Sequence, residues 1–251
     1  MNKNRMAIAG MLFAALAAVL MYSLYSIKVN PGLNTLYNRF GVEMAPNMVT
    51  LVVFDWRGYD TLGECFILVC GVLALSLLFG RGLVSEPEVK TRETHHQPDV
   101  KPTLVLSYFA SSLILFAIAY GIYLTLGGHI TPGGGFQGGS LIASGVLLSL
   151  VVYGRRHLIP IDHNFLLKLE TTGLLIYLLL GLFGLIFSGY YLYNLGVNFY
   201  SIVPSSISSL FNYPDRVNAG ILPYLNIAVM LKVSAGLSTL ILVLLEVKSH
   251  D

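Results

Sequence analysis

Six stretches of this 251-residue chain are long and apolar enough to cross a lipid bilayer as helices. A transmembrane helix needs about 20 mostly apolar residues, and in hydrocarbon only helices and closed barrels satisfy every backbone polar group. The six stretches cover residues 6–27, 61–80, 103–126, 136–153, 165–188 and 221–247. They predict an all-α, polytopic integral membrane protein with about six transmembrane helices.

The composition supports this fold class. Hydrophobic residues make up 55% of the chain, and charged residues only 11%, whereas a soluble domain averages roughly 25% charged residues. Most of the surface therefore cannot face water, and we expect a multi-pass protein in the lipid bilayer of the cell (cytoplasmic or inner) membrane. The formal net charge is +2 and the chain has no basic run, so we expect no nucleic-acid partner.

The positions of lysine and arginine predict that both termini are cytoplasmic. Lys3 and Arg5 precede a first apolar stretch that is longer than a signal-peptide core and is followed by no small-residue cleavage site. We therefore interpret that stretch as a retained helix. With the N-terminus inside, the inner segments carry ten basic residues and the outer segments four, as the positive-inside rule demands. Residues 127–135 and 189–220 are then outside.

A hydrophilic run, "SEPEVKTRETHHQPDVKP" at residues 85–102, predicts a solvated linker. It divides the chain into a two-span segment at 1–85, a linker at 86–102 and a four-span domain at 103–251. The adjacent histidines of this run have no further ligand nearby, and the five-residue spacing of Cys65 and Cys70 matches no zinc or redox pair. We expect no metal site.

Two segments on the predicted outer side differ from ordinary loops. Residues 46–56, "PNMVTLVVFDW", are apolar but too short to span the membrane, and residues 190–211 are rich in Tyr, Asn and Ser. Irregular backbone at membrane depth must be covered by protein, and aromatic residues favour the interface. Both segments are expected to lie along the membrane surface or to pack on a neighbour.

Lys232 is the best candidate for ion chemistry, because it lies near the middle of the last apolar stretch. Ionisable residues inside a membrane are rare and usually functional, and a lysine there tends to lose its proton unless a carboxylate or water holds the charge. We predict a proton or cation relay element. The alternative is a structural ion pair, or an amine that faces a partner subunit.

Three carboxylates are further candidates. Glu170 lies about 9 Å from the centre of its helix at 1.5 Å per residue, so contact with Lys232 is possible but not required. Asp60 and Glu64 lie four residues apart at the start of the second span, which places them on one helix face. We expect them to form an outer acidic site for ion handling, or an anchor in which Asp60 only caps the helix.

The stretch "HITPGGGFQGGS" at residues 129–140 contains G-x-G-x-x-G. It is no dinucleotide turn, because a transmembrane stretch precedes it and the required acidic residue is missing. The small-xxx-small pairs Gly134–Gly138 and Gly135–Gly139 predict instead a tight turn and a helix that packs closely on another helix. His129 is either an ion-gating group or a hydrogen-bonding group at the outer surface.

Two passages resemble a known family. "GGHITPGGGFQGGSLIASGVLL" at 127–148 is similar to the signature of the MrpB/MnhB family, small subunits of multisubunit Na⁺/H⁺ antiporters. "LPYLNIAVMLKVSAGL" at 222–237 resembles the last-span region of the same family, the lysine included. A third passage, "FDWRGYDTLGE" at 54–64, is similar to the C-terminal region of the large MrpA antiporter subunit. The chain thus combines two pieces that ordinarily belong to separate subunits.

The resemblance implies a subunit of a larger assembly without a redox cofactor of its own. Its partners would be other Mrp-type antiporter subunits, or the subunits of membrane-bound hydrogenases, formate hydrogenlyases or sulfur reductases. We predict a non-catalytic transport subunit that helps to couple Na⁺ and H⁺ translocation, and no catalytic residues. A purely structural subunit and a stand-alone small-molecule permease are the alternatives.

Overall fold

The computed structural model describes residues 3–26, 41, 44–78, 103–153, 163–196, 203–211 and 218–247. The chain divides into two compact units, Met1–Arg39 and Phe40–Asp251. The first unit contains one described helix, α1 (Lys3–Ser26). The hydrophilic linker predicted at 86–102 lies outside the described residues.

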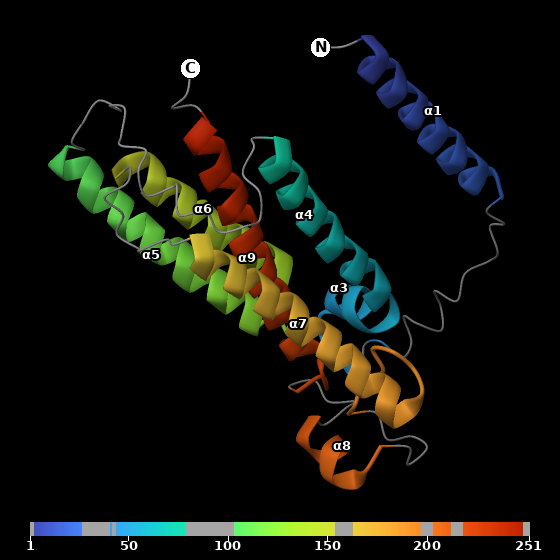
Figure 1. The fold of residues 1–251 in the computed structure, drawn as a ribbon. Coiled ribbons are helices and arrows are strands. Elements are labelled where there is room, and N and C mark those ends of the chain that lie inside the picture. Colours follow the sequence, from blue (N-terminus) through green and yellow to red (C-terminus); the bar gives the residue numbers. More distant parts are fainter. Residues whose placement is uncertain are drawn as a thin grey trace. The chain divides into compact units, whose positions relative to one another are not determined.

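Five long helices form the second unit, and each is long and apolar enough to cross a membrane. They are α4 (Gly58–Leu78), α5 (Leu104–Leu126), α6 (Gly135–Tyr153), α7 (His163–Ser188) and α9 (Leu222–Val247), shown in Figure 1. In α1 the apolar stretch is shorter, Ala14–Ser23. All regular structure in the described ranges is helical. The predicted all-α, polytopic membrane fold is confirmed, whereas the cytoplasmic position of both termini stays a prediction.

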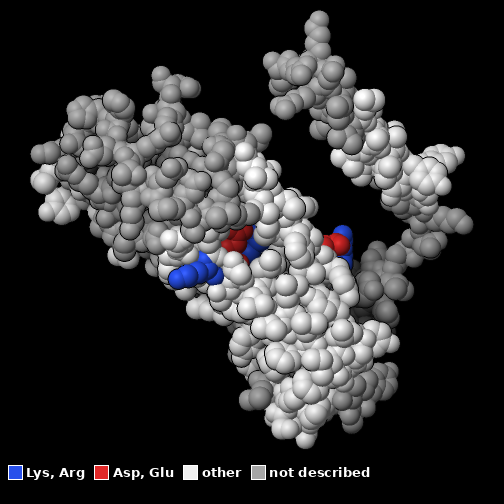
Figure 2. Space-filling model, viewed as in Figure 1, with Lys and Arg blue, Asp and Glu red and all other residues white. Residues whose placement is uncertain are grey.

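Helix α9 is the centre of the second unit. It contacts α4, α5, α6 and α7 (Figure 1), and 56% of its apolar stretch is buried, against 17% for α5. An apolar helix with neighbours on several sides can bury most of its surface against them. The outer faces of the surrounding helices carry large exposed apolar side chains and few charges (Figure 2), as contact with lipid or with another subunit requires.

Glycines let α6 lie against two helices at once. Gly135 and Gly139 face α9, where a Cβ added at Gly139 would lie 2.9 Å from Val233 Cβ. Gly138 faces α5, where an added Cβ would collide with Thr125 and with the backbone at Gly121. Small residues allow this close approach of helix backbones in a membrane.

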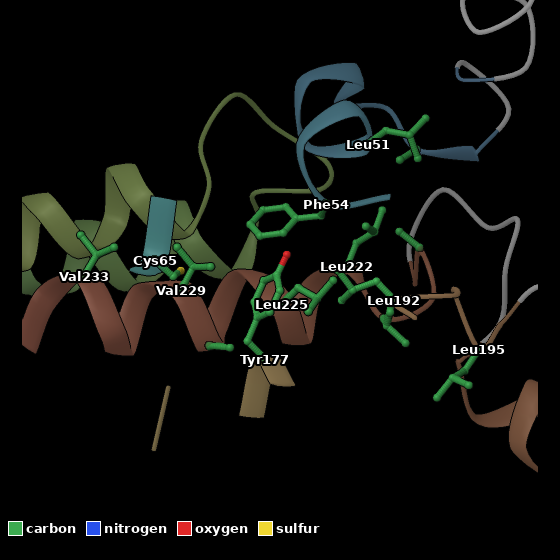
Figure 3. Close-up of a cluster of buried hydrophobic side chains, with 14 residues drawn as sticks. Leu51, Phe54, Cys65, Tyr177, Leu192, Leu195, Leu222, Leu225, Val229 and Val233 are labelled. Carbon is green, nitrogen blue, oxygen red and sulfur yellow. The ribbon is translucent and has the colours of Figure 1, made fainter. Parts of the chain in front are cut away.

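A short irregular segment joins the core from the N-terminal side of α4. It consists of α3 (Met48–Leu51) and a single π-helical turn, η1 (Val52–Trp56). Leu51 and Phe54 are buried in a cluster with Tyr177 of α7 and with Leu222 and Leu225 of α9 (Figure 3). The segment 46–56 is thus covered mainly by its own chain rather than lying along the membrane surface.

The segment before α9 is held by one buried amide. Asn194 Oδ1 accepts a hydrogen bond from the Ile221 backbone N–H at 3.1 Å, and Asn194 Nδ2 donates to the Ala219 carbonyl at 3.5 Å. Gly220 has φ +64° and leaves no room for a Cβ beside Asn194. This contact fixes the start of α9 against residues 190–196. Within the second outer segment, a short helix, α8 (Ser205–Phe211), is also described.

Gly135→Ala should destabilise the protein, because the added methyl group would collide with the Asn226 carbonyl oxygen and approach Val229 Cβ to 2.9 Å. Overpacking of this kind costs about 1–3 kcal/mol. Gly71→Ala in α4 is the matched control, since nothing lies within 4 Å of its added Cβ. Thermal melting of the two purified variants in detergent measures the difference, and equal melting temperatures would contradict the packing.

Candidate functional site

A buried ion pair lies at the centre of the helix bundle. Lys232, near the middle of α9, is completely buried, and its Nζ lies 3.2 Å from Oε1 of Glu170 on α7. The Glu170 side chain is only 9% exposed. The contact that the sequence left open is therefore made, between residues 62 positions apart.

Two glycines make room for this pair. A Cβ added at Gly173, one turn after Glu170 on α7, would lie 2.7 Å from the Lys232 backbone nitrogen. A Cβ added at Gly236, one turn after Lys232 on α9, would lie 3.2 Å from Glu170 Oε1. The first glycine brings the two helix backbones together, and the second leaves space for the carboxylate.

The surroundings of the pair are mostly apolar but not entirely. Cys65 of α4 is buried and within electrostatic range of Lys232. Ser234 and Ser238 are buried on α9, where their hydroxyl groups donate to backbone carbonyls one turn earlier. An isolated charge in such a place is strongly disfavoured, so each member of the pair stabilises the charge of the other.

An amine and a carboxylate in contact at low polarity can exchange a proton. Burial disfavours both charged forms, while the mutual attraction favours them, so the ion pair and the neutral pair approach each other in energy. The two groups then titrate as one unit. This arrangement is suited to accepting or releasing a proton when a nearby charge arrives or leaves.

The other predicted acidic residues lie on α4. Asp60, at the first turn, forms an ion pair with Arg57, and both side chains are largely exposed. Glu64 is one turn deeper, exposed, and lines a groove between α4, α6 and α9. No hydrogen bond or ion pair joins Asp60 or Glu64 to the Lys232–Glu170 pair in the described parts of the chain.

His129 is buried rather than surface-exposed, at 5% exposure, in the turn after α5. Its backbone carbonyl accepts a hydrogen bond from the Asn47 N–H at 3.1 Å. The structure places it in the contact between residues 44–57 and the glycine-rich turn. Its role as an ion gate stays a prediction.

Asn47 is a residue that sequence reasoning missed. Its Nδ2 donates to the carbonyls of Gly128 and Thr131 at 2.6 and 3.0 Å, and Thr50 Oγ1 donates to Gly128 at 2.5 Å. Asn47 also caps α3, since its Oδ1 accepts from Val49 N–H. An asparagine directly before an apolar run is a helix-start signal, but nothing in the sequence indicates the contact 81 residues away.

The comparison with protein families is decisive for the last four long helices. Residues 105–239 match the family described as "Domain related to MnhB subunit of Na+/H+ antiporter". The chain belongs to this MnhB family. The resemblance that the glycine-rich passage and the last-span passage carried is confirmed. Glu170 and Lys232 both lie inside the matched region, whereas Asp60 and Glu64 lie before it.

Relatives in archaea and bacteria extend this finding. An uncharacterized protein of Methanocaldococcus jannaschii, MJ1307, is 41% identical over 250 residues, which is 95% of this chain and 91% of that protein. The corresponding small Na(+)/H(+) antiporter subunit of Alkalihalophilus pseudofirmus is 36% identical over 98 residues, and that of Bacillus subtilis is 37% identical over 87. These alignments cover 38% and 33% of this MnhB-family chain, and 66% and 59% of the two antiporter proteins.

Two solved structures share the fold over almost the whole chain. One is the membrane-bound sulfane sulfur reductase, an archaeal respiratory membrane complex, with a TM-score of 0.64, 26% identity, and coverage of 96% of this chain and 98% of that chain. The other is the Mrp complex of Dietzia sp. DQ12-45-1b, with a TM-score of 0.60, 18% identity, and coverage of 95% and 26%. The second likeness concerns the fold alone. This MnhB-family chain is thus related to Mrp antiporters and to membrane-bound respiratory complexes.

Lys232→Met should lower stability by about 3 kcal/mol, because it leaves the buried Glu170 carboxylate without a partner. Lys232→Met combined with Glu170→Met should recover most of this loss, since no unpaired charge remains. Lys168→Met, an exposed lysine on α7, is the control and should melt like the wild type. A double variant less stable than Lys232→Met would contradict the pairing.

Proposed function

We propose that this chain is a transport subunit, without catalytic residues, of an Mrp-type cation/proton antiporter module, in which the Lys232–Glu170 pair helps to couple Na⁺ and H⁺ movement. The observation that carries the proposal is the complete burial of Lys232 at 3.2 Å from Glu170 within two membrane-spanning helices. Ionisable residues at such depth belong mostly to ion and proton paths.

The chemistry of the pair supports a relay. Lys232 and Glu170 exchange a proton without leaving the bundle, and their balance between charged and neutral forms responds to a charge arriving nearby. Antiport needs such a group, because the movement of one ion must change the energy of the other. Glu64 supplies a second carboxylate in α4, and the exposed Arg57–Asp60 pair marks the end of that helix.

The likeness to subunits of Mrp antiporters and of a respiratory membrane complex supports an assembly in the cell membrane. The neighbours of the chain are other Mrp-type antiporter subunits, accompanied by hydrogenase-type subunits if the host is a redox-driven complex. The N-terminal segment, residues 1–85, plays the part of the MrpA C-terminal region. Its support is the hydrogen bonding of Asn47 to the glycine-rich turn, which joins the two pieces at a polar contact.

A structural role is the second candidate, and the tight enclosure of the pair favours it. Gly173 and Gly236 hold Lys232 and Glu170 at a helix contact with almost no exposed surface. A buried polar pair of this kind can serve only to specify how two helices align. The two roles differ in what happens to transport when the charges are removed from an assembled complex.

Lys232→Ala should lower Na⁺-dependent proton movement by roughly tenfold or more, because the relay loses its proton-carrying amine. The measurement is dye-monitored proton transport in vesicles that hold the whole complex, normalised to the amount of assembled complex. Lys168→Ala is the control, since Lys168 is exposed on the same helix as Glu170. Wild-type transport by assembled Lys232→Ala complex would refute the relay.

A further inference from the structure

A groove of about 530 Å³ lies between α4, α6 and α9. Glu64 and Leu68 of α4 form one wall, Gln137 and Ser140 of α6 form the opposite wall, and Val233 with its neighbours on α9 forms the floor. The groove therefore has polar groups on both walls, although most of its lining is apolar.

The floor of this groove is one side-chain layer away from the buried ion pair. A Cβ at Gly236 would lie 3.2 Å from Glu170 Oε1 and, equally, 3.2 Å from Leu68 Cδ2. Val233 in the floor directly follows Lys232 in the chain, and Leu237 in the floor follows Gly236. Leu68 and Gly236 are thus the contact that separates the groove from Glu170.

Glu64 indicates what fills the groove. It lies about 9 Å inside α4, at 1.5 Å per residue from the start of the helix, and is exposed within a membrane-spanning helix. No ion pair or hydrogen bond satisfies its carboxylate in the described parts of the chain. Intramembrane charges of this kind face a water-filled cavity or a paired group, and Gln137 and Ser140 supply polar groups across the groove that hydrate with it.

We propose that the groove is a water-filled access path through which protons reach the Lys232–Glu170 pair, with Glu64 as the carboxylate at its wall. This inference rests on the proposed relay role of the pair. Water in the groove meets Glu64 first, and the Leu68–Gly236 contact is the last barrier before Glu170. The pair exchanges protons with the groove when this contact loosens.

The path also gives the glycine-rich stretch two functions. Gly135, Gly138 and Gly139 face α9 and α5 and hold α6 close, while Gln137 and Ser140 of the same stretch face the groove. Close packing by the glycines brings the polar wall opposite Glu64. A purely structural packing motif would not need polar residues at these two positions.

Cysteine labelling of the assembled complex tests whether the groove holds water. Ile67→Cys in the groove and Leu115→Cys on the outer face of α5 are matched, since both lie mid-helix and are 72% and 70% exposed. Both are made with Cys70→Ser, because Cys70 is exposed and Cys65 is buried. A charged, membrane-impermeant methanethiosulfonate is applied from each side, and the mass of this chain reports labelling.

We expect Ile67→Cys to react roughly tenfold or more faster than Leu115→Cys, because the reagent needs ionised thiol and water. Leu237→Cys on the groove floor, tested in parallel, should follow Ile67→Cys. If a lipid or a helix of another subunit fills the groove, both groove cysteines stay as unreactive as Leu115→Cys, and the access path is refuted.

Transport by each complex before and after labelling then tests the link to the ion pair. Labelling in the groove should reduce Na⁺-dependent proton movement about as much as Lys232→Ala does. Fast labelling with unchanged transport would overturn the path while leaving the relay intact. Unchanged transport in Lys232→Ala would instead overturn the relay, and the labelling rates still report whether the groove holds water.

Discussion

A lysine completely enclosed by membrane helices is the constraint on which the rest of this structure depends. Its charge needs an opposite charge in contact, and Glu170 of α7 provides one at 3.2 Å. A glutamate side chain reaches a neighbouring helix only if the backbones lie close, and Gly173 permits this approach. Helix α9, which carries Lys232, is accordingly the most buried of the five long helices.

Close approach on one side of α9 is matched by close approach on the other. Gly135 and Gly139 bring α6 against α9, and Asn226 Oδ1 of α9 accepts a hydrogen bond from the Gly135 N–H at 2.8 Å. The turn before α6 is in turn held by Asn47, from a segment far earlier in the chain. The N-terminal piece thus stabilises the turn that positions α6, and α6 forms one wall of the groove beside the ion pair.

Hydropathy predicted the positions of the long helices, and charge in an apolar stretch predicted Lys232 and Glu170, because both signals are local in the sequence. The contact between these two residues was not predictable. It depends on the rotation and depth of two helices, which packing at Gly173 and Gly236 determines. Asn47 and the burial of His129 were missed for the same reason, since a turn 81 residues away defines their surroundings. Membrane orientation and the resemblance of residues 54–64 stay predictions.

The most direct test of the account is transport by the charge-free double variant, Lys232→Met with Glu170→Met, in fully assembled complex. Removing both charges together avoids an unpaired buried charge, so the complex should assemble and remain stable. If the pair is a relay, Na⁺-dependent proton movement should nevertheless fall by roughly tenfold or more. Wild-type transport by this assembled double variant would contradict the account and leave the pair a structural contact between α7 and α9.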